Sequence, residues 1–275
     1  MDRGTIIGLV AALVAIFGAA VVESGSISIL LALLNAPSAM IVFGGTLGAV
    51  IVSFPLSRVL QLTKVLGVAF RDVPSSERDL VEMFVRLAER ARREGLLALE
   101  GEASEIADHH LKKGLLLVVD GTDPELVREI MESDVTAMAD RHEGRYAMFE
   151  AAGGFAPTMG IIGTVMGLVN VLSHLDKPDE LGKSIATAFI ATLYGVLSAN
   201  VFWLPVAQRL KQRNREEVAQ RQLAVEGVLS VQAGDNPRVV REKLESFLPR
   251  AAPAEPSAES DTAAAGGDTP AAQAA

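Results

Sequence analysis

The stretch GFAPTMGIIGTVMGLVNVL, residues 154–172, carries no ionisable side chain, although it holds a proline, several glycines and two threonines. A helix of this length covers most of the roughly 30 Å of hydrocarbon in a bilayer. Four blocks are free of charge in this way, at residues 4–22, 37–54, 155–173 and 184–206. The sequence therefore predicts an all-α, polytopic membrane protein with four transmembrane helices and a helical cytoplasmic domain.

The composition excludes several classes of protein. The 275 residues include no cysteine, which excludes a disulfide framework and thiolate chemistry. The net charge is −9 and no basic cluster is interleaved with aromatic residues, so nucleic-acid binding is not expected. No Walker, Rossmann or G-x-S-x-G pattern is present, so the chain is not expected to be an enzyme. His109 and His110 are adjacent, about 100° apart on a helix, which makes them a poor metal pair, and we expect no metal site and no cofactor.

Basic residues are distributed unequally between the two sides of the four blocks. One side carries Arg3, Arg58, Lys64, Arg141, Arg145, Arg209, Lys211, Arg213 and Arg215, whereas the other carries only Lys177 and Lys183. The positive-inside rule then places both termini and the long middle segment in the cytoplasm. The first block lacks a long basic region before it and a second block follows closely, so we expect an uncleaved anchor and not a secretory signal.

We expect five parts along the chain. Residues 1–54 hold the first two spans and 153–206 the last two, each pair with a short periplasmic connection. Residues 55–152 form the cytoplasmic helical domain, 207–249 a helical C-terminal segment, and 250–275 an acidic Ala/Pro-rich tail. The chain from Pro249 onward lacks the apolar residues for a core and is predicted to be disordered. Residues 23–37 are too short to span a membrane and are predicted to be interfacial or lipid-facing, and residues 177–183 a polar loop.

Local signals place the helices of the cytoplasmic parts. Ser76 is a candidate N-cap for a helix that Gly95 ends, and an amphipathic piece beginning at Glu105 ends near Gly121. Asp123 and Pro124 begin a helix with no strong breaker before the third span, so it is expected to continue into that span. The fourth span is expected to continue past Pro205 as a long helix, and Asn236 with Pro237 begins a last short helix.

Small residues share one face in each predicted span. In the third span these are Gly160, Gly163, Thr164 and Gly167, and in the fourth they are Ser184, Ala188, Ala191, Thr192, Gly195 and Ala199. The first span has Gly4, Gly8, Ala12, Ala15 and Gly18, and the second Gly44, Gly45 and Gly48. Small residues allow helix backbones to approach, so close packing explains these faces. In the third and fourth spans, a wall facing another helix or a hydrated path is an alternative.

None of the four blocks contains an ionisable residue, although proton relays and charged-substrate sites normally place one within the membrane. Either the chain only packs or handles a neutral solute, or the carboxylate comes from a partner's helix. Pro157 lacks a backbone N–H and so frees carbonyl groups at one membrane boundary, where they can hold water. A simple first-turn proline that starts the third span is the alternative.

The segments GGFAPTMGIIGTVMGLVNVL, IATAFIATLYGVLSANVFWLPVAQRLKQR and VQAGDNPRVVREKLESFLP resemble the MotA and PomA family, the larger subunits of bacterial flagellar stators. GTIIGLV, PSAMIVFGGTLGAVIVSFP and ARREGLLALE fit the same family, and the resemblance extends from Met1 to about Pro249. The block from 154 to 213 is shared in outline with the ExbB and TolQ energisers. Four spans with a long loop between the second and third favour the stator type, since the energisers are expected to have three.

The resemblance implies a ring of five copies around two copies of a MotB-like, single-span, peptidoglycan-binding partner in the bacterial inner membrane. The partner's helix brings an aspartate, and ions cross where the two proteins meet. The family positions that frame this path are matched by Pro157, Thr164, Ala191 and Thr192. Gly160, Gly163, Gly167 and Gly195 are then expected to pack around the partner. The ion is expected to be H⁺ before Na⁺, because sodium-driven relatives tend to carry a further threonine where Ala191 stands.

A charged segment carries a second implied site. Arg90, Arg92, Arg93, Glu94, Glu100 and Glu102 form an ordinary solvated face on the pattern alone. The resemblance matches Arg92, Arg93, Glu100 and Glu102 to a patch that contacts a rotor protein of the flagellar switch complex. The chain is therefore predicted to be an ion-conducting stator subunit. An energiser of the ExbB and TolQ kind, a stator-type motor without a flagellum, and a membrane scaffold without ion flux are the alternatives.

Overall fold

The computed structural model describes residues 3–70, 77–175 and 178–248. Within these ranges the chain is helical and contains no strand, which confirms the all-α class. The helices are α1 (Arg3–Ser24), α2 (Ser28–Ala32), α3 (Ala36–Ala39), η1 (Met40–Gly44), α4 (Gly45–Ser53), α5 (Leu56–Val59), α6 (Leu62–Ala69), α7 (Glu77–Glu94), η2 (Leu96–Leu99), α8 (Glu100–Glu105), α9 (His109–Val119), α10 (Pro124–Ser173), α11 (Pro178–Leu197), η3 (Ser198–Trp203), α12 (Leu204–Gln232) and α13 (Pro237–Glu245). The segments η1 and η3 are π-helical and η2 is a 3₁₀ helix.

Four helical stretches are long and apolar enough to cross a membrane, which confirms the four predicted spans. They are Gly4–Ser24, Ala36–Ser53, Pro124–Ser173 and Leu181–Gln232. The protein is therefore a polytopic membrane protein. The second and fourth spans each contain a π-helical turn, η1 and η3, where the regular i→i−4 hydrogen-bond pattern is interrupted.

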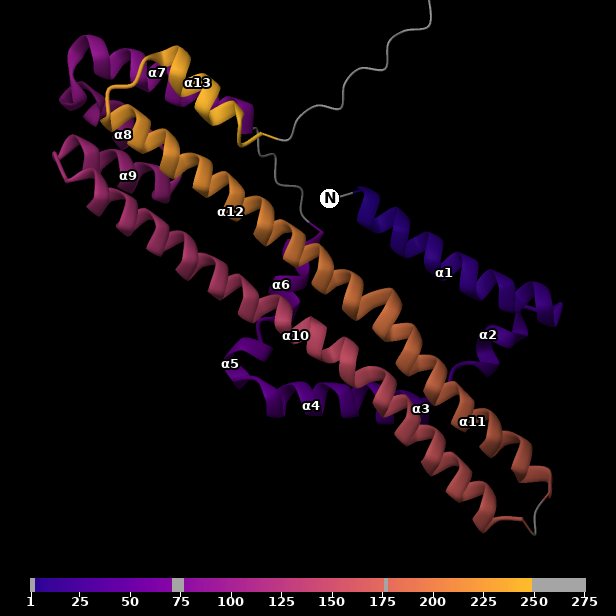
Figure 1. Ribbon diagram of the computed structural model, residues 1–275. Coiled ribbons are helices and arrows are strands. Elements are labelled where there is room, and N and C mark those ends of the chain that lie inside the picture. Colours follow the sequence, from indigo (N-terminus) through magenta and orange to yellow (C-terminus); the bar gives the residue numbers. More distant parts are fainter. Residues whose placement is uncertain (1–2, 71–76, 176–177, 249–275) are drawn as a thin grey trace, which may run out of the picture.

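Two very long helical arms organise the molecule. Helix α10 runs for 50 residues from Pro124, and the Asp123 side chain caps it by accepting a hydrogen bond from the Glu125 N–H at 3.0 Å. Gly144 does not interrupt it, so the predicted continuation into the third span is confirmed. Helices α11, η3 and α12 form the second arm, and the two arms lie side by side in Figure 1. The expected boundaries at residues 152 and 206 therefore fall inside continuous helices.

A polar lobe caps the arms at the end away from the spans (Figure 1). We define the polar lobe as α7, η2, α8, α9 and α13 with the ends of α10 and α12 that pack on them. Its core holds the fully buried side chains Phe84, Leu99, Leu115, Met131 and Val228. Helix α7 ends just before Gly95, as predicted, because Gly95 has a φ of +84°, which is unfavourable for residues with a side chain. Ser76 lies outside the described residues.

Several local predictions are corrected by the structure. The amphipathic piece expected from Glu105 begins at His109, because the Asp108 carboxylate accepts hydrogen bonds from the N–H groups of His110 and Leu111 and so caps α9 there. The polar loop expected at residues 177–183 is wrong from residue 178 onward, because α11 already begins at Pro178. The Asn236 cap of α13 is confirmed by its bond from the Arg238 N–H at 3.0 Å. The tail from Pro249 lies outside the described residues.

The first span is less embedded than the other three. No residue of the apolar window in α1 is buried, and Gly8 and Gly18 face open space. Gly8 and Gly18 of this small-residue face are therefore not packed against any of the described residues. Helix α2 has no buried residue and exposes Ile27 and Leu31, so its interfacial or lipid-facing position stays a prediction.

Candidate functional site

The small faces of the third and fourth spans meet each other. A Cβ atom on Gly163 would lie 2.5 Å from the Cβ of Ala191, and one on Gly167 would lie 2.6 Å from the Cβ of Ala188. On the facing helix, a Cβ on Gly195 would lie 2.5 Å from the carbonyl oxygen of Ala156. These separations are shorter than any side chain tolerates, so α10 and α11 approach closely because the residues are glycine.

The predicted threonines lie at this contact. Thr164 and Thr192 share a hydroxyl–hydroxyl hydrogen bond, and the Thr164 Oγ1 also lies 3.1 Å from the Gly160 carbonyl and 3.2 Å from that of Ala188. A hydroxyl has one proton, so Thr164 donates to one of these acceptors at a time while accepting from Thr192. Both side chains are half-buried. The structure thus brings a short chain of exchangeable hydroxyls to a helix junction that contains no charge.

Pro157 lies inside α10 and not at its start. The alternative of a first-turn proline is therefore wrong, because the helix began at Pro124 in the polar lobe. Since Pro157 has no N–H, the carbonyl of Gly153 lacks its regular partner one turn earlier. The Pro157 Cα lies 3.2 Å from a Cβ placed on Gly195, so Pro157 itself lies at the α10–α11 contact.

The glycines predicted to pack around a partner therefore have a role within the chain. Gly160, Gly163, Gly167 and Gly195 all lie at the junction of α10 and α11. Close packing of these two helices explains why they are glycines. A contact of the same face with a partner helix stays a prediction.

A further polar contact links the second and fourth spans, and the sequence reasoning missed it. The Asn35 side chain donates to the Thr187 Oγ1 at 3.0 Å, and the Ser38 hydroxyl donates to the Thr187 carbonyl at 2.9 Å. The Tyr194 hydroxyl donates to the Leu33 carbonyl at 2.6 Å and accepts from the Asn35 N–H at 3.1 Å. The signal available in the sequence was Asn35 just before Pro37, an N-cap pattern at the start of a span.

The charged residues predicted to face a rotor lie together at the tip of the polar lobe, where α7, η2 and α8 meet. Arg92, Arg93 and Glu100 are exposed and make no ion pair with other described residues. Glu102 differs, because it is half-buried and forms an ion pair with Arg90, which also holds Glu94 at 3.1 Å. Arg90 therefore ties α8 to α7, while the other three charges are available to a partner.

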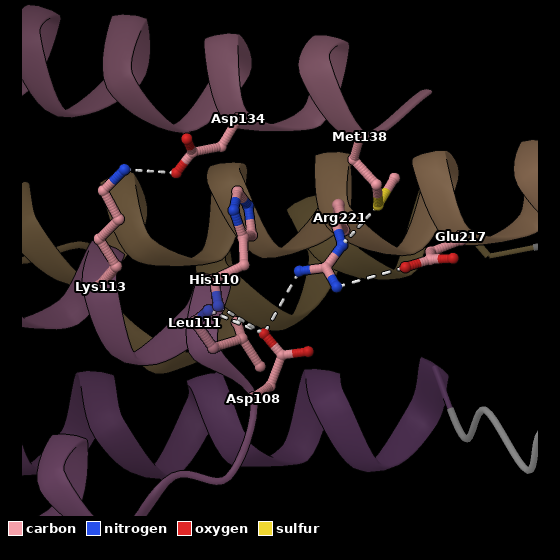
Figure 2. Close-up of polar contacts among 8 residues, drawn as sticks. All are labelled: Asp108, His110, Leu111, Lys113, Asp134, Met138, Glu217 and Arg221. Carbon is pink, nitrogen blue, oxygen red and sulfur yellow. Dashed lines mark hydrogen bonds and ion pairs between the residues drawn. The ribbon is translucent and has the colours of Figure 1, made fainter. Parts of the chain in front are cut away.

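A second charged cluster lies beside the core of the polar lobe (Figure 2). Arg221 of α12 contacts Asp108 at 3.4 Å and Glu217 at 3.3 Å, and Lys113 of α9 contacts Asp134 of α10 at 2.5 Å. His110 is 6% exposed and its Nε2 has no hydrogen-bond partner. Burial lowers its pKa, and the charge of Arg221 lowers it further. The described residues contain no group of His, Cys, Asp and Glu side chains arranged to hold a metal ion.

The fold and the site define a class of protein. The third and fourth spans meet through glycines and hydroxyls, with no ionisable group among the residues described at their contact, and both continue as helices into a charged lobe. This is a polytopic α-helical membrane protein whose closely packed spans continue into a charged lobe.

Comparison with known proteins identifies the family within this class. Residues 102–223 match the model of the MotA/TolQ/ExbB proton channel family, and residues 6–95 match that of the motility protein A N-terminal region. The chain is 41% identical to motility protein A of Bacillus subtilis over 90% of its own length and 92% of the relative's. It is 36% identical to the chemotaxis protein PomA of Vibrio alginolyticus over 90% of its length and 96% of the relative's. The chain belongs to the motility protein A family.

A solved structure agrees with this assignment. The flagellar MotAB stator complex from Bacillus subtilis matches with a TM-score of 0.84 and 40% sequence identity. The match covers 90% of this chain and 96% of that chain. The arrangement of the four spans and the polar lobe is therefore shared with a stator protein.

Proposed function

We propose that the chain is the ion-conducting stator subunit of a bacterial flagellar motor, coupling proton flow with a MotB-like partner to torque on the rotor. The single observation that carries the proposal is the uncharged α10–α11 junction with its linked Thr164 and Thr192 hydroxyls. A path without its own carboxylate needs one from a second protein, and the relatives include a subunit of a MotAB stator complex. We further propose that five copies surround the partner in the inner membrane, with both termini in the cytoplasm.

The polar lobe is the part of the chain that we propose transmits force to the rotor. Arg92, Arg93 and Glu100 are exposed at the tip, and the helices α10 and α12 run from the polar lobe that carries this tip towards the membrane spans. A continuous helix transmits a displacement at its membrane end to its far end. We propose that this tip contacts the rotor, with Glu102 held by Arg90 and acting mainly to position α8.

We propose protons as the transported ion. Sodium must exchange its hydration shell for several oxygen ligands at once. At the junction, Ala191 brings a methyl group against Gly163 and supplies no oxygen beyond its backbone carbonyl. A proton needs only a titrating carboxylate, which the partner would bring, and hydrogen-bonding groups such as the two threonine hydroxyls. The driving force is about 2.3 kcal/mol per charge for each 100 mV of membrane potential, plus any pH gradient.

The test measures motility, or growth inhibition by an unplugged complex with its partner, at fixed membrane potential. External sodium is varied and a protonophore is added. The expected result is rotation that stops with the protonophore and does not follow sodium. Rotation that follows sodium and persists with the protonophore would contradict the proton assignment and leave the stator function standing.

Two substitutions test the path itself. Pro157→Leu restores a backbone N–H, and Thr192→Ala removes one hydroxyl of the hydrogen-bonded pair. Each is expected to lower ion flux without loss of the assembled complex, because both side chains are only half-buried. Thr158→Ala is a control, because that exposed hydroxyl bonds only to the Phe155 carbonyl of its own helix. Normal flux in both path variants would show that this face only packs.

A further inference from the structure

The helix that begins the second span is interrupted between α2 and α3. Asn35 has an extended backbone, with φ −131° and ψ 107°, so the Leu33 carbonyl and the Asn35 N–H cannot pair along one continuous helix. The Tyr194 hydroxyl supplies both missing partners, donating to the Leu33 carbonyl at 2.6 Å and accepting from the Asn35 N–H at 3.1 Å. Within the hydrocarbon region, irregular backbone is tolerated only where protein groups or water satisfy it, and here the Tyr194 hydroxyl satisfies both groups.

The residues at this interruption also form hydrogen bonds with α11 at Thr187. The Asn35 side-chain nitrogen donates to the Thr187 hydroxyl, and the Ser38 hydroxyl, which is fully buried, donates to the Thr187 carbonyl at 2.9 Å. Asn35, Ser38, Thr187 and Tyr194 form what we call the α3–α11 polar contact. It joins residues far apart in the sequence and lies where α3 meets α11 (Figure 1).

This contact bears directly on the hydroxyl pair. The carbonyl of Thr187 is held by Ser38 of α3, and the next carbonyl, that of Ala188, lies 3.2 Å from the Thr164 Oγ1 of α10. Helix α11 is therefore held from both sides at adjacent peptide groups. Because the α10–α11 contact is made of glycine and alanine at van der Waals distance, a small rotation of α11 changes the Thr164–Thr192 contact.

We infer that Tyr194 and Asn35 are positioning residues for ion passage: through the α3–α11 polar contact they set the register of α11 against α10, and with it the Thr164–Thr192 hydroxyl pair. The inference rests on the proposed stator function and adds residues that touch no ion. As a consequence, the Tyr194 hydroxyl, on the side of α11 that faces α3, affects ion flux along the side that faces α10.

The variant Tyr194→Phe tests this most directly. It removes the hydroxyl and keeps the ring, which packs 6.0 Å from that of Phe43, centroid to centroid. Expressed with the partner, the complex is expected to assemble at the wild-type level. Its ion flux per assembled complex is expected to fall about threefold to tenfold, the factor that corresponds to one or two hydrogen bonds of ordinary net strength. The pH at which flux is half-maximal is also expected to shift.

The chain offers a matched control, because it contains two tyrosines. Tyr146→Phe deletes the same atom in the polar part of α10, where the hydroxyl forms no hydrogen bond with described residues, and is expected to leave flux unchanged. Combining Tyr194→Phe with Asn35→Ala should cost less than the sum of the two changes, since both act through one contact.

The outcomes separate the inference from the function on which it rests. If Tyr194→Phe reduces the amount of complex but leaves flux per complex and its pH dependence unchanged, the contact is only structural and the inference is wrong. If that variant does not assemble, Thr187→Val, which removes one hydroxyl and keeps the Ser38 bond, is measured in its place and read by the same criterion. If wild-type protein with its partner conducts no ions, the stator function itself is contradicted.

Discussion

At the scale of single residues, Gly195 has the least freedom to change. A methyl group there would meet the backbone carbonyl oxygen of Ala156 at 2.5 Å, and backbone cannot move aside as a flexible side chain can. Gly195→Ala is expected to cost about 1–3 kcal/mol by overpacking. The measurement is the thermal stability of the detergent-solubilised complex. Gly182→Ala on the same helix, where a Cβ meets nothing within 4 Å, is the control and should not lower the stability.

Arg93 tests the tip of the polar lobe at the same scale. Its charge is exposed and unpaired among the described residues, so Arg93→Glu should not unfold the lobe. Since an exposed ion pair contributes about 0–1 kcal/mol, motility should be impaired and not abolished, with flux and assembly intact. Rotor charge reversals should partly restore it, whereas the same change at the exposed Arg141 on α10 should have no effect. A motility loss that tracks loss of membrane-inserted protein would make the patch structural.

At the scale of one element, α9 places a buried histidine, His110, in the polar lobe. Burial and Arg221 lower the pKa of His110, Lys113 lowers it further, and Asp108 and Asp134 oppose them. In the unfolded chain the histidine pKa is about 6.5. As the pH falls through this value, the unfolded chain therefore binds more protons than the folded chain. The stabilising contribution is present above about pH 6.5 and is lost progressively below it.

The measurement is the thermal unfolding midpoint of the purified protein between about pH 5.5 and 7.5, the range in which histidine changes charge. On acidification, the unfolding midpoint of the wild-type protein should fall by roughly 2–4 °C for each kcal/mol of free energy of unfolding that is lost. His110→Gln should show a weaker pH dependence, whereas His109→Gln, at an exposed position, should behave as wild type. Equal pH dependence in wild type and His110→Gln would show that other groups destabilise the lobe in acid.

At the scale of the whole molecule, orientation in the membrane determines what every site can contact. The excess of lysine and arginine on one side of the spans predicts that the C-terminal end lies in the cytoplasm. A reporter fused after Arg250 should be active only if it is of the cytoplasmic type, and a fusion in the short connection near Lys177 should be active only as a periplasmic type. The reverse pattern would move the charged tip away from any rotor and contradict the proposed mechanism.

The sequence alone determined the parts of this protein that depend on local chemistry. The four spans follow from blocks without charge, because lipid excludes charged side chains wherever the helix packs. The starts at Asp123–Pro124 and Asn236–Pro237 and the end at Gly95 are also local, because a cap or a positive φ involves only neighbouring residues. The same reasoning predicted which glycines share a face.

Only the tertiary structure decided what those faces meet. Helical periodicity places Gly160, Gly163 and Gly167 together but does not specify whether a partner or α11 covers them, and the structure shows α11. The pairing of Arg90 with Glu102 and of Tyr194 with the interrupted backbone at Leu33 likewise joins separate elements. Such contacts depend on the relative placement of whole helices, which many distant side chains set jointly, so no short stretch of sequence contains them.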